Sequence, residues 1–386
     1  MKEKVYIKKV NGYQDAVEVV EDMFCQLEST KQINENTKII LKPNLLAKHI
    51  PEHAVTTHPE ILRGAIKACL SRGAKRENIL VLDSAGGIYN SGQMKSLYQV
   101  CGLTKVCNEE GVALYTLCQS TTIDIDGQVA KQFDIINPVL QADYIINLPK
   151  MKTHVMTGMS AACKNMFGII PGLKKSEWHM RFPDKERFGH MIVDLLEAIP
   201  PNIAIVDGIL AMEGDGPAGG NPRNVGIVMA SENMYQLDLA IAGMMNLNAM
   251  RVPYLKAANS RNLCSESFDK KDIVGDETLL EPISNWKLPE SYTGKNNANT
   301  DFAAFVPSFI RPIVKKIEHT IAPHPVIDKK RCIGCGKCKE ICSKDAIIIK
   351  DKKAKIIRKQ CIHCFCCHEV CPVKAIEVKK LEIFKL

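Results

Sequence analysis

Eight cysteines near the end of this 386-residue chain repeat one spacing, Cys-x2-Cys-x2-Cys-x3-Cys. The first copy is Cys332, Cys335, Cys338 and Cys342, and the second is Cys361, Cys364, Cys367 and Cys371. Three thiolates on a tight loop can bind three corners of a [4Fe–4S] cluster, while the fourth cysteine of the motif binds the other cluster. The spacing therefore predicts two [4Fe–4S] clusters. The expected ligands are Cys332, Cys335, Cys338 and Cys371 for cluster one, and Cys361, Cys364, Cys367 and Cys342 for cluster two.

Zinc is the alternative metal, because CxxC pairs also occur in zinc sites. Eight cysteines in a duplicated pattern favour iron–sulfur clusters instead, and Gly334 and Gly336 fit a backbone wrapped closely around an inorganic core. Two residues depart from the usual pattern. Ser343 stands where proline is common and is expected to loosen a turn. Cys366 is a surplus thiol, expected to be a packed side chain or a substitute ligand.

A second set of reactive side chains follows apolar runs in the first 250 residues. In parallel α/β sheets, ligands bind beyond the carboxyl ends of the strands. The runs are followed by lysines and by polar partners, among them Lys42, Asn44, Asp83 and Ser84. A lysine whose pKa is lowered by like-charged neighbours can donate a proton. We predict a site for a small anionic substrate with these catalytic residues: Lys150, Lys152, His154, Lys164 and Asp207. The alternative is that the lysines are merely solvated strand ends.

The elements that would position these residues alternate short apolar runs with helical patterns, as in a largely parallel sheet covered by helices. The runs predicted as strands are 38–41, 79–82, 112–117, 144–147, 203–206 and 225–229. The patterns predicted as helices are 59–71, 187–198 and 234–245. We therefore expect an α/β fold with a mostly parallel sheet and helices on both faces, followed by a small α+β cluster-binding domain.

Composition divides the chain into three parts. Residues 1–264 carry the α/β pattern, 265–325 are polar and irregular, and 326–386 hold the cysteine motifs. The middle part is expected to be a linker or an arm that wraps around the main domain. Within it, 302–314 is modestly apolar, but its two prolines favour packing on the main domain over lying on a membrane surface.

Four segments of the large domain together resemble the domain-of-unknown-function family 362 (DUF 362). They are LKPNLL (41–46), INLPKMKTHVMTG (146–158), AACKNMFGIIPG (161–172) and IVDGILAMEGDGPAGGNP (205–222). The resemblance implies no reaction, but members of the family often carry a ferredoxin tail. The duplicated cysteine unit is similar to the bacterial-type ferredoxin domain with two [4Fe–4S] clusters, which implies electron transfer.

Charge and composition narrow the class of protein. The chain is 46% hydrophobic and 24% charged, as in a soluble globular protein. It shows no secretory signal and no apolar stretch of membrane-spanning length, so we expect a cytoplasmic protein of anaerobic metabolism whose cysteines stay reduced. From residue 321 onward, 16 Lys and Arg face 7 Asp and Glu. This basic tail predicts an acidic electron-transfer partner of the ferredoxin or flavodoxin type. No recognition motif indicates nucleic acid.

Gly214, Gly216 and Gly219 match the dinucleotide-binding fingerprint as a string of letters. That fingerprint requires a strand that leads directly into the glycines and a helix that leads out. Here 207–213 intervene, Pro217 interrupts the motif and a strand-like run follows. We expect a loop over the site instead of a dinucleotide site, and no motif indicates a flavin.

Three functions remain open from the sequence, and the leading one is an oxidoreductase of the ferredoxin-dependent reductase type. In it, electrons pass through the two clusters to an anionic substrate at the strand ends. The alternative is a non-enzymatic electron carrier or maturation partner that docks another protein. In a third possibility the clusters only brace the fold or sense oxygen.

Overall fold

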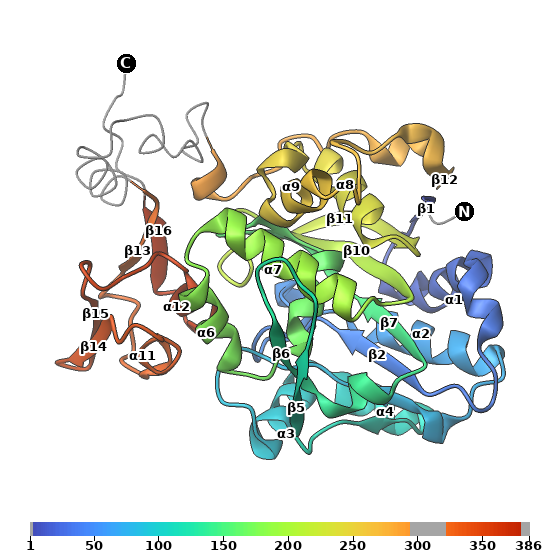
Figure 1. The fold of residues 1–386 in the computed structure, drawn as a ribbon, viewed down its shortest axis with the longest axis horizontal. Helices are drawn as coiled ribbons and strands as arrows, with labels where there is room; N and C mark the ends of the chain where they lie inside the picture. Colours follow the sequence, from blue (N-terminus) through green and yellow to red (C-terminus); the bar gives the residue numbers. More distant parts are fainter. Residues whose placement is uncertain (1–2, 294–321, 380–386) are drawn as a thin grey trace.

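The computed structural model of the chain describes residues 3–293 and 322–379. An α/β domain is built around a ten-stranded sheet, and the C-terminal residues form a smaller domain of short two-stranded sheets beside it (Figure 1). The apolar stretch 302–314, expected to pack on the main domain, lies outside the described residues.

The large sheet has the strand order β12-β1-β11-β10-β7-β2-β3-β4, with β8 and β9 attached beside β10. Most neighbours are parallel; β11 is antiparallel to both β1 and β10, and β9 is antiparallel to β8. The prediction of a mostly parallel sheet is therefore confirmed. The strands are β1 (Val5–Lys9), β2 (Ile39–Pro43), β3 (Ile79–Val81), β4 (Ala113–Leu114), β7 (Tyr144–Leu148), β8 (Lys150–His154), β9 (Gly158–Ser160), β10 (Ile203–Glu213), β11 (Asn221–Ser231) and β12 (Ile273–Gly275).

Several strands differ from the prediction, and the difference at β10 changes the place of a predicted site residue. Strand β10 continues to Glu213 and forms a long hairpin with β11, because buried apolar residues continue beyond Val206. Asp207 was expected to follow this strand, but it lies inside the strand and faces Lys150 of β8 in the register. The segment 112–117 keeps only the two-residue strand β4. Strand β12, from the predicted arm, pairs with β1 at the sheet edge.

Helices cover both faces of the sheet, as predicted. Ile39 and Leu41 of β2 pack in a core with α1 to α4, while Ile40, pointing the opposite way, belongs to the core under α7 to α9. Helix α2 has the predicted bounds, since Pro59 occupies its first turn and His58 caps it by accepting the N–H of Glu60. The helices are α1 (Ala16–Gln26), α2 (Pro59–Ser71), α3 (Ser91–Val100), α4 (Leu103–Glu110), α5 (Ala162–Asn165), α6 (Lys174–Arg181), α7 (Lys185–Ala198), α8 (Met234–Met244) and α9 (Pro253–Ser260). A separate hairpin joins β5 (Ser120–Asp124) to β6 (Gln132–Ile136).

The C-terminal domain pairs β13 (His324–Ile327) with β16 (Ile376–Lys379), and β14 (Ile347–Lys350) with β15 (Lys353–Ile356). Its short helices are α11 (Lys337–Glu340) and α12 (Cys366–Glu369). Helix α12 lies toward α6 of the α/β domain (Figure 1). Hydrogen bonds join the two domains: Ser343 Oγ donates to the carbonyl of Ser176 at 3.1 Å, and Lys374 Nζ donates to the carbonyl of Gly220 at 2.8 Å. The serine that departs from the ferredoxin pattern thus makes a contact between the domains.

Candidate functional site

Two cavities in the C-terminal domain are each lined by four of the motif cysteines. The first is lined by Cys332, Cys335, Cys338 and Cys371. The second is lined by Cys342, Cys361, Cys364 and Cys367, together with the surplus Cys366. In both, the fourth motif cysteine comes from the other half of the repeat, which is the crossed arrangement expected of a ferredoxin with two clusters.

The surroundings of these sulfurs suit iron–sulfur ligation. Three backbone N–H groups donate to cysteine sulfurs: Ala346 to Cys342 at 3.3 Å, Ala375 to Cys371 at 3.2 Å and Ala354 to Cys332 at 3.4 Å. Hydrogen bonds to sulfur tune such clusters. Across residues 3–293 and 322–379, no three His, Cys, Asp or Glu side chains converge as ligands of one ion. A cubane core holds its four thiolates farther apart than a single zinc ion does.

A third cavity lies between the carboxyl ends of the large domain's strands and the C-terminal domain. Side chains from both domains line it. The α/β domain contributes Asn44, Asp83, Ser84, Lys152, His154, Lys164, Asn165, Lys175 and His179, among others, and the C-terminal domain contributes Ile341, Cys366, Glu369 and Val370. We call this space the interdomain cavity.

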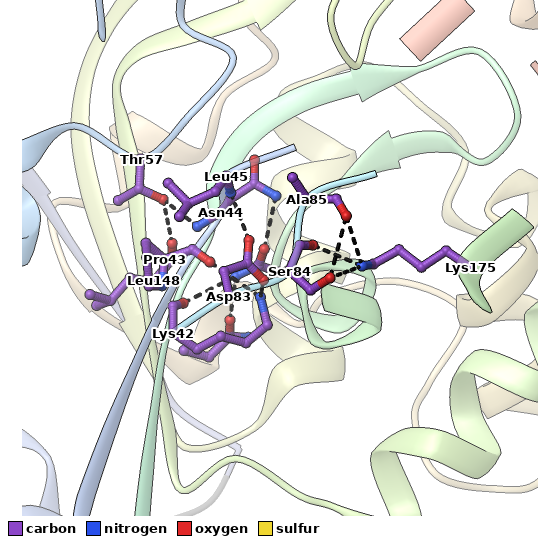
Figure 2. Close-up of polar contacts among 12 residues, drawn as sticks. Lys42, Pro43, Asn44, Leu45, Thr57, Asp83, Ser84, Ala85, Leu148 and Lys175 are labelled. Atoms are coloured by element: carbon purple, nitrogen blue, oxygen red, sulfur yellow. Dashed lines mark hydrogen bonds and ion pairs between the residues drawn. The ribbon is translucent and has the colours of Figure 1, made fainter. Parts of the chain in front are cut away.

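One wall of the interdomain cavity is fixed by a buried ion pair (Figure 2). Nζ of Lys42 lies 2.7 Å from Oδ1 of Asp83, and both side chains are buried. The other carboxylate oxygen of Asp83 accepts the N–H of Leu45 at 2.8 Å. These contacts join the ends of β2 and β3, so the strand ends converge as the sequence predicted.

Lys152 is a buried lysine whose hydrogen-bond partners, among the residues that the structure describes, are all neutral. Nζ donates to Oδ1 of Asn44 at 2.6 Å and to the carbonyl of Val55 at 2.8 Å. Burial lowers the pKa of Lys152 to about 7; Glu369 opposes the shift, while the charges of Lys164 and Lys150 add to it. The side chain can therefore carry or release a proton near neutral pH.

Two further lysines of the cavity also lack a carboxylate partner among the described residues. Lys175 Nζ donates to the carbonyl of Ser84 at 2.8 Å and to its hydroxyl at 2.9 Å, as Figure 2 shows. Burial lowers the pKa of Lys175 to about 7. Nζ of Lys164 lies 4.8 Å from the ring centroid of Phe167 and makes no hydrogen bond or ion pair within the described chain.

His154 faces a carboxylate of the C-terminal domain. Its Nε2 lies 3.3 Å from Oε1 of Glu369, and its Nδ1 accepts the N–H of Met156 at 3.1 Å. Burial lowers the pKa of His154 to about 4, so the ring is neutral at pH 7 and the proton is on Nε2. Burial alone would raise the pKa of Glu369, but His154 and nearby positive charges, that of Lys164 included, lower it to about 2.

The structure divides the predicted catalytic residues into two groups. Lys152, His154 and Lys164 line the interdomain cavity. Lys150 and Asp207 are not among its lining residues and form a separate buried ion pair with Nζ 2.8 Å from Oδ2. Tyr13 donates its hydroxyl proton to Asp207 at 2.9 Å, so this pair is fully engaged in holding β8 against β10.

Lys175, Glu369 and Cys366 are among the lining residues that were not predicted as part of this site. Lys175 lies in the first turn of α6, far from any strand end in sequence, and no local pattern marks it. Glu369 lies between the motif cysteines Cys367 and Cys371 in a basic tail, and this placement of a carboxylate could have been noticed in the sequence. Cys366 was noticed as a surplus thiol, but its position on the walls of two cavities depends on how the domains pack.

The glycine motif forms the tip of the β10–β11 hairpin, not a strand-to-helix turn. Strand β10 leads directly into Gly214, so the expectation that 207–213 separate the strand from the glycines is wrong. Strand β11, and not the helix that the dinucleotide fingerprint needs, follows the glycines. An added Cβ on Gly219 would lie 2.5 Å from Nε2 of His368, and one on Gly216 would lie 2.0 Å from the carbonyl oxygen of Thr153. The glycines therefore allow the hairpin tip to pack tightly beside the site and against helix α12.

Comparison with known proteins identifies both domains. Residues 39–243 match the family described as Domain of unknown function (DUF362), and residues 325–378 match the 4Fe-4S dicluster domain. The chain belongs to the DUF362 family. Its C-terminal domain is an iron–sulfur domain. In the described part of this DUF362 protein, no helix is long and apolar enough to cross a bilayer.

A relative and a solved structure can be compared with this DUF362 chain. Thylakoid-associated protein sll1697 of Synechocystis sp. is 30% identical over 261 residues, which cover 67% of this chain and 78% of the relative. The structure of the lactate racemase apoprotein from Thermoanaerobacterium thermosaccharolyticum aligns with a TM-score of 0.37 and 13% identity. That alignment covers 60% of this chain and 55% of the racemase chain.

Proposed function

We propose that this protein is a reductase in which electrons pass through two [4Fe–4S] clusters to an anionic substrate in the interdomain cavity. One observation carries the proposal. Cys366, which lies between the cluster-two ligands Cys364 and Cys367 in sequence, lines both the second cysteine cavity and the interdomain cavity. A substrate held there would be separated from cluster two by roughly one side chain.

The residues of the cavity fit a reduction in which a double bond of the substrate gains two electrons and two protons. When bound, each cluster supplies one electron at a time. Lys164 and Lys175 attract the anion, and Lys152, whose pKa is about 7, donates one proton. The second proton comes from Lys164. Nε2 of His154 lies 3.3 Å from Oε1 of Glu369, so these side chains bring β8 and helix α12 together beside the cavity.

The electron donor is proposed to be an acidic one-electron carrier protein that docks at the first cysteine cavity. Cys335 is exposed there, and the neighbouring Ile333 is 60% exposed. Lys337 and Lys339 of helix α11 are exposed next to them. An apolar contact ringed by positive charge suits an acidic partner, whose approach the charges would steer.

Reoxidation of the reduced protein tests the proposed function. Full-length protein, reduced anaerobically by dithionite and freed of excess reductant, is mixed with the small-molecule fraction of an anaerobic lysate. We expect the visible absorbance of oxidised clusters to return, at least tenfold more slowly in Lys152→Met, with a product two hydrogens heavier detected by mass spectrometry. If the clusters stay reduced in the presence of this small-molecule fraction but are oxidised by an acceptor protein, the protein would instead be an electron carrier.

A further inference from the structure

The interdomain cavity carries more positive than negative charge. Its described lining holds three lysines, Lys152, Lys164 and Lys175, and two carboxylates, Asp83 and Glu369. Asp83 is already neutralised by Lys42, which lies behind it. His154 is neutral at pH 7, as is His179, whose pKa burial lowers to about 3. With the three lysines protonated, the described walls have a surplus of two positive charges.

Such a surplus is costly where the charges are removed from water. Buried charges in proteins are normally paired, because removing an ammonium from water costs several kcal/mol without a counter-charge. Within the described parts of the chain, buried Lys152 donates only to an amide oxygen and a carbonyl, and Lys175 donates only to the hydroxyl and carbonyl oxygens of neutral residues. Lys164 has its ammonium over an aromatic ring and no described acceptor. None of these three cations has a carboxylate within ion-pair distance among the described residues.

An unpartnered imidazole nitrogen adds an independent sign of a ligand. His179 is buried, lines the same cavity, and its Nδ1 has no hydrogen-bond partner in the described structure. The ring stacks on Phe188 with centroids 4.5 Å apart, which fixes its plane. A buried ring nitrogen without a partner is unusual unless a ligand or water meets it.

We infer that the interdomain cavity binds a compact dianion, with two carboxylates or one phosphate group, whose two charges match the surplus of Lys152, Lys164 and Lys175. The inference rests on the proposed function for its site and deepens it by giving the charge of the substrate. The amide groups of Asn44 and Asn165 and the hydroxyls of Ser84 and Ser160 supply further neutral hydrogen-bonding groups on the wall. Leu46, Phe167 and Val370 contact the carbon skeleton.

Calorimetric titration of the oxidised full-length protein at pH 6.5 tests this inference without any electron transfer. The probes are succinate, its monoamide succinamate, butyrate and glycerol 3-phosphate. Succinate or glycerol 3-phosphate is expected to bind at least about tenfold more tightly than either monoanion, a difference of about 1.4 kcal/mol. A preference for succinate identifies a dicarboxylate, and a preference for glycerol 3-phosphate identifies a phosphate ester. Equal affinity for the dianions and monoanions would overturn the inference.

A matched pair of variants locates the binding. Lys164→Gln removes one cation of the cavity and should lower dianion affinity about tenfold while changing monoanion affinity less. Lys185→Gln is the control, because Lys185 is also a partly buried lysine over an aromatic ring, that of Tyr292, but does not line the cavity. It should leave dianion affinity within about twofold. Thermal unfolding without ligand shows that both variants fold.

The two proposals fail separately. The oxidised protein could bind dianions selectively while the reduced protein never reoxidises in the turnover test. That result would contradict the proposed reductase function but support the inferred dianion site. Turnover of a neutral or singly charged substrate, with no preference for dianions in the binding test, would contradict the inferred dianion site but support the proposed reductase function.

Discussion

Lys42 and Asp83 illustrate how a single buried ion pair can fix the strand ends that line a site. Their side chains are 0% and 3% exposed, and they join the ends of two parallel strands under the interdomain cavity. Removing one partner of such a pair leaves an uncompensated charge, which is far more costly than losing an exposed pair.

Asp83→Asn is therefore expected to lower the free energy of unfolding by about 3–5 kcal/mol, as measured by anaerobic urea denaturation. Lys31→Gln is the matched control, because its ion pair with Glu28 is exposed and should contribute at most about 1 kcal/mol. Equal effects of the two substitutions would show that the buried pair has no special structural role.

Dianion affinity should fall as pH rises through neutrality. In the free protein, burial lowers the pKa values of Lys152 and Lys175 to about 7, so above that pH they are mostly neutral and must take up protons to hold an anion. Glu369 remains negative, and His154 and His179 remain neutral, across this range. Succinate titrations between pH 6.5 and 8.5, in buffers of different ionisation enthalpy, should show weakening affinity and proton uptake. Affinity that increases with pH would contradict the lysine assignment.

Among the elements, the β10–β11 hairpin connects the sheet to the iron–sulfur domain. At its tip, the carbonyl of Gly220 accepts a hydrogen bond from Nζ of Lys374, and Gly219 lies so close to His368 that no side chain would fit between them. Gly219→Val should push the hairpin tip away from helix α12 and lower the free energy of unfolding by roughly 1–3 kcal/mol. Hydrogen exchange across 366–371 should then be about tenfold faster. Gly243→Ala, at a helical glycine with open space, should leave this exchange unchanged.

Sequence patterns predicted the elements that have strong local signals. Helix α2 was predicted with its observed bounds because Pro59 and Gly73 mark its ends, and β2, β3 and β7 were found to within two residues at each end. The end of β10 was missed because the Asp207-Gly208 pair is a turn signal in sequence, whereas the strand continues through it with a β-bulge between Gly208 and Leu210. Asp207 was consequently placed after the strand instead of inside it.

In the complete chain, the iron–sulfur domain serves as a wall of the interdomain cavity. The sequence predicted that Lys152, His154 and Lys164 would lie near the strand ends. It did not predict Glu369 and Cys366 opposite them, because no local pattern specifies how two domains pack. Cys335 and Ile333, which are exposed, line the first cysteine cavity, which lies wholly within the C-terminal domain and shares no lining residue with the interdomain cavity.

Charge reversal on helix α11 tests whether the electron donor docks at the first cysteine cavity, as proposed. The Lys337→Glu/Lys339→Glu double variant should slow cluster reduction by an acidic carrier such as flavodoxin about tenfold or more at low ionic strength, and less in high salt. Reduction by dithionite should be unaffected. The control, Lys67→Glu on helix α2, changes an exposed lysine of the α/β domain and should have little effect. Slowing by the control alone would place the docking surface elsewhere.

Metal and acid-labile sulfide analysis of the anaerobically purified full chain provides the sharpest test of an electron path through both cysteine-lined cavities. The predicted result is about eight irons and about eight sulfides per chain, four of each for every cluster. Stoichiometric zinc in place of iron, or only about four irons per chain, would contradict it.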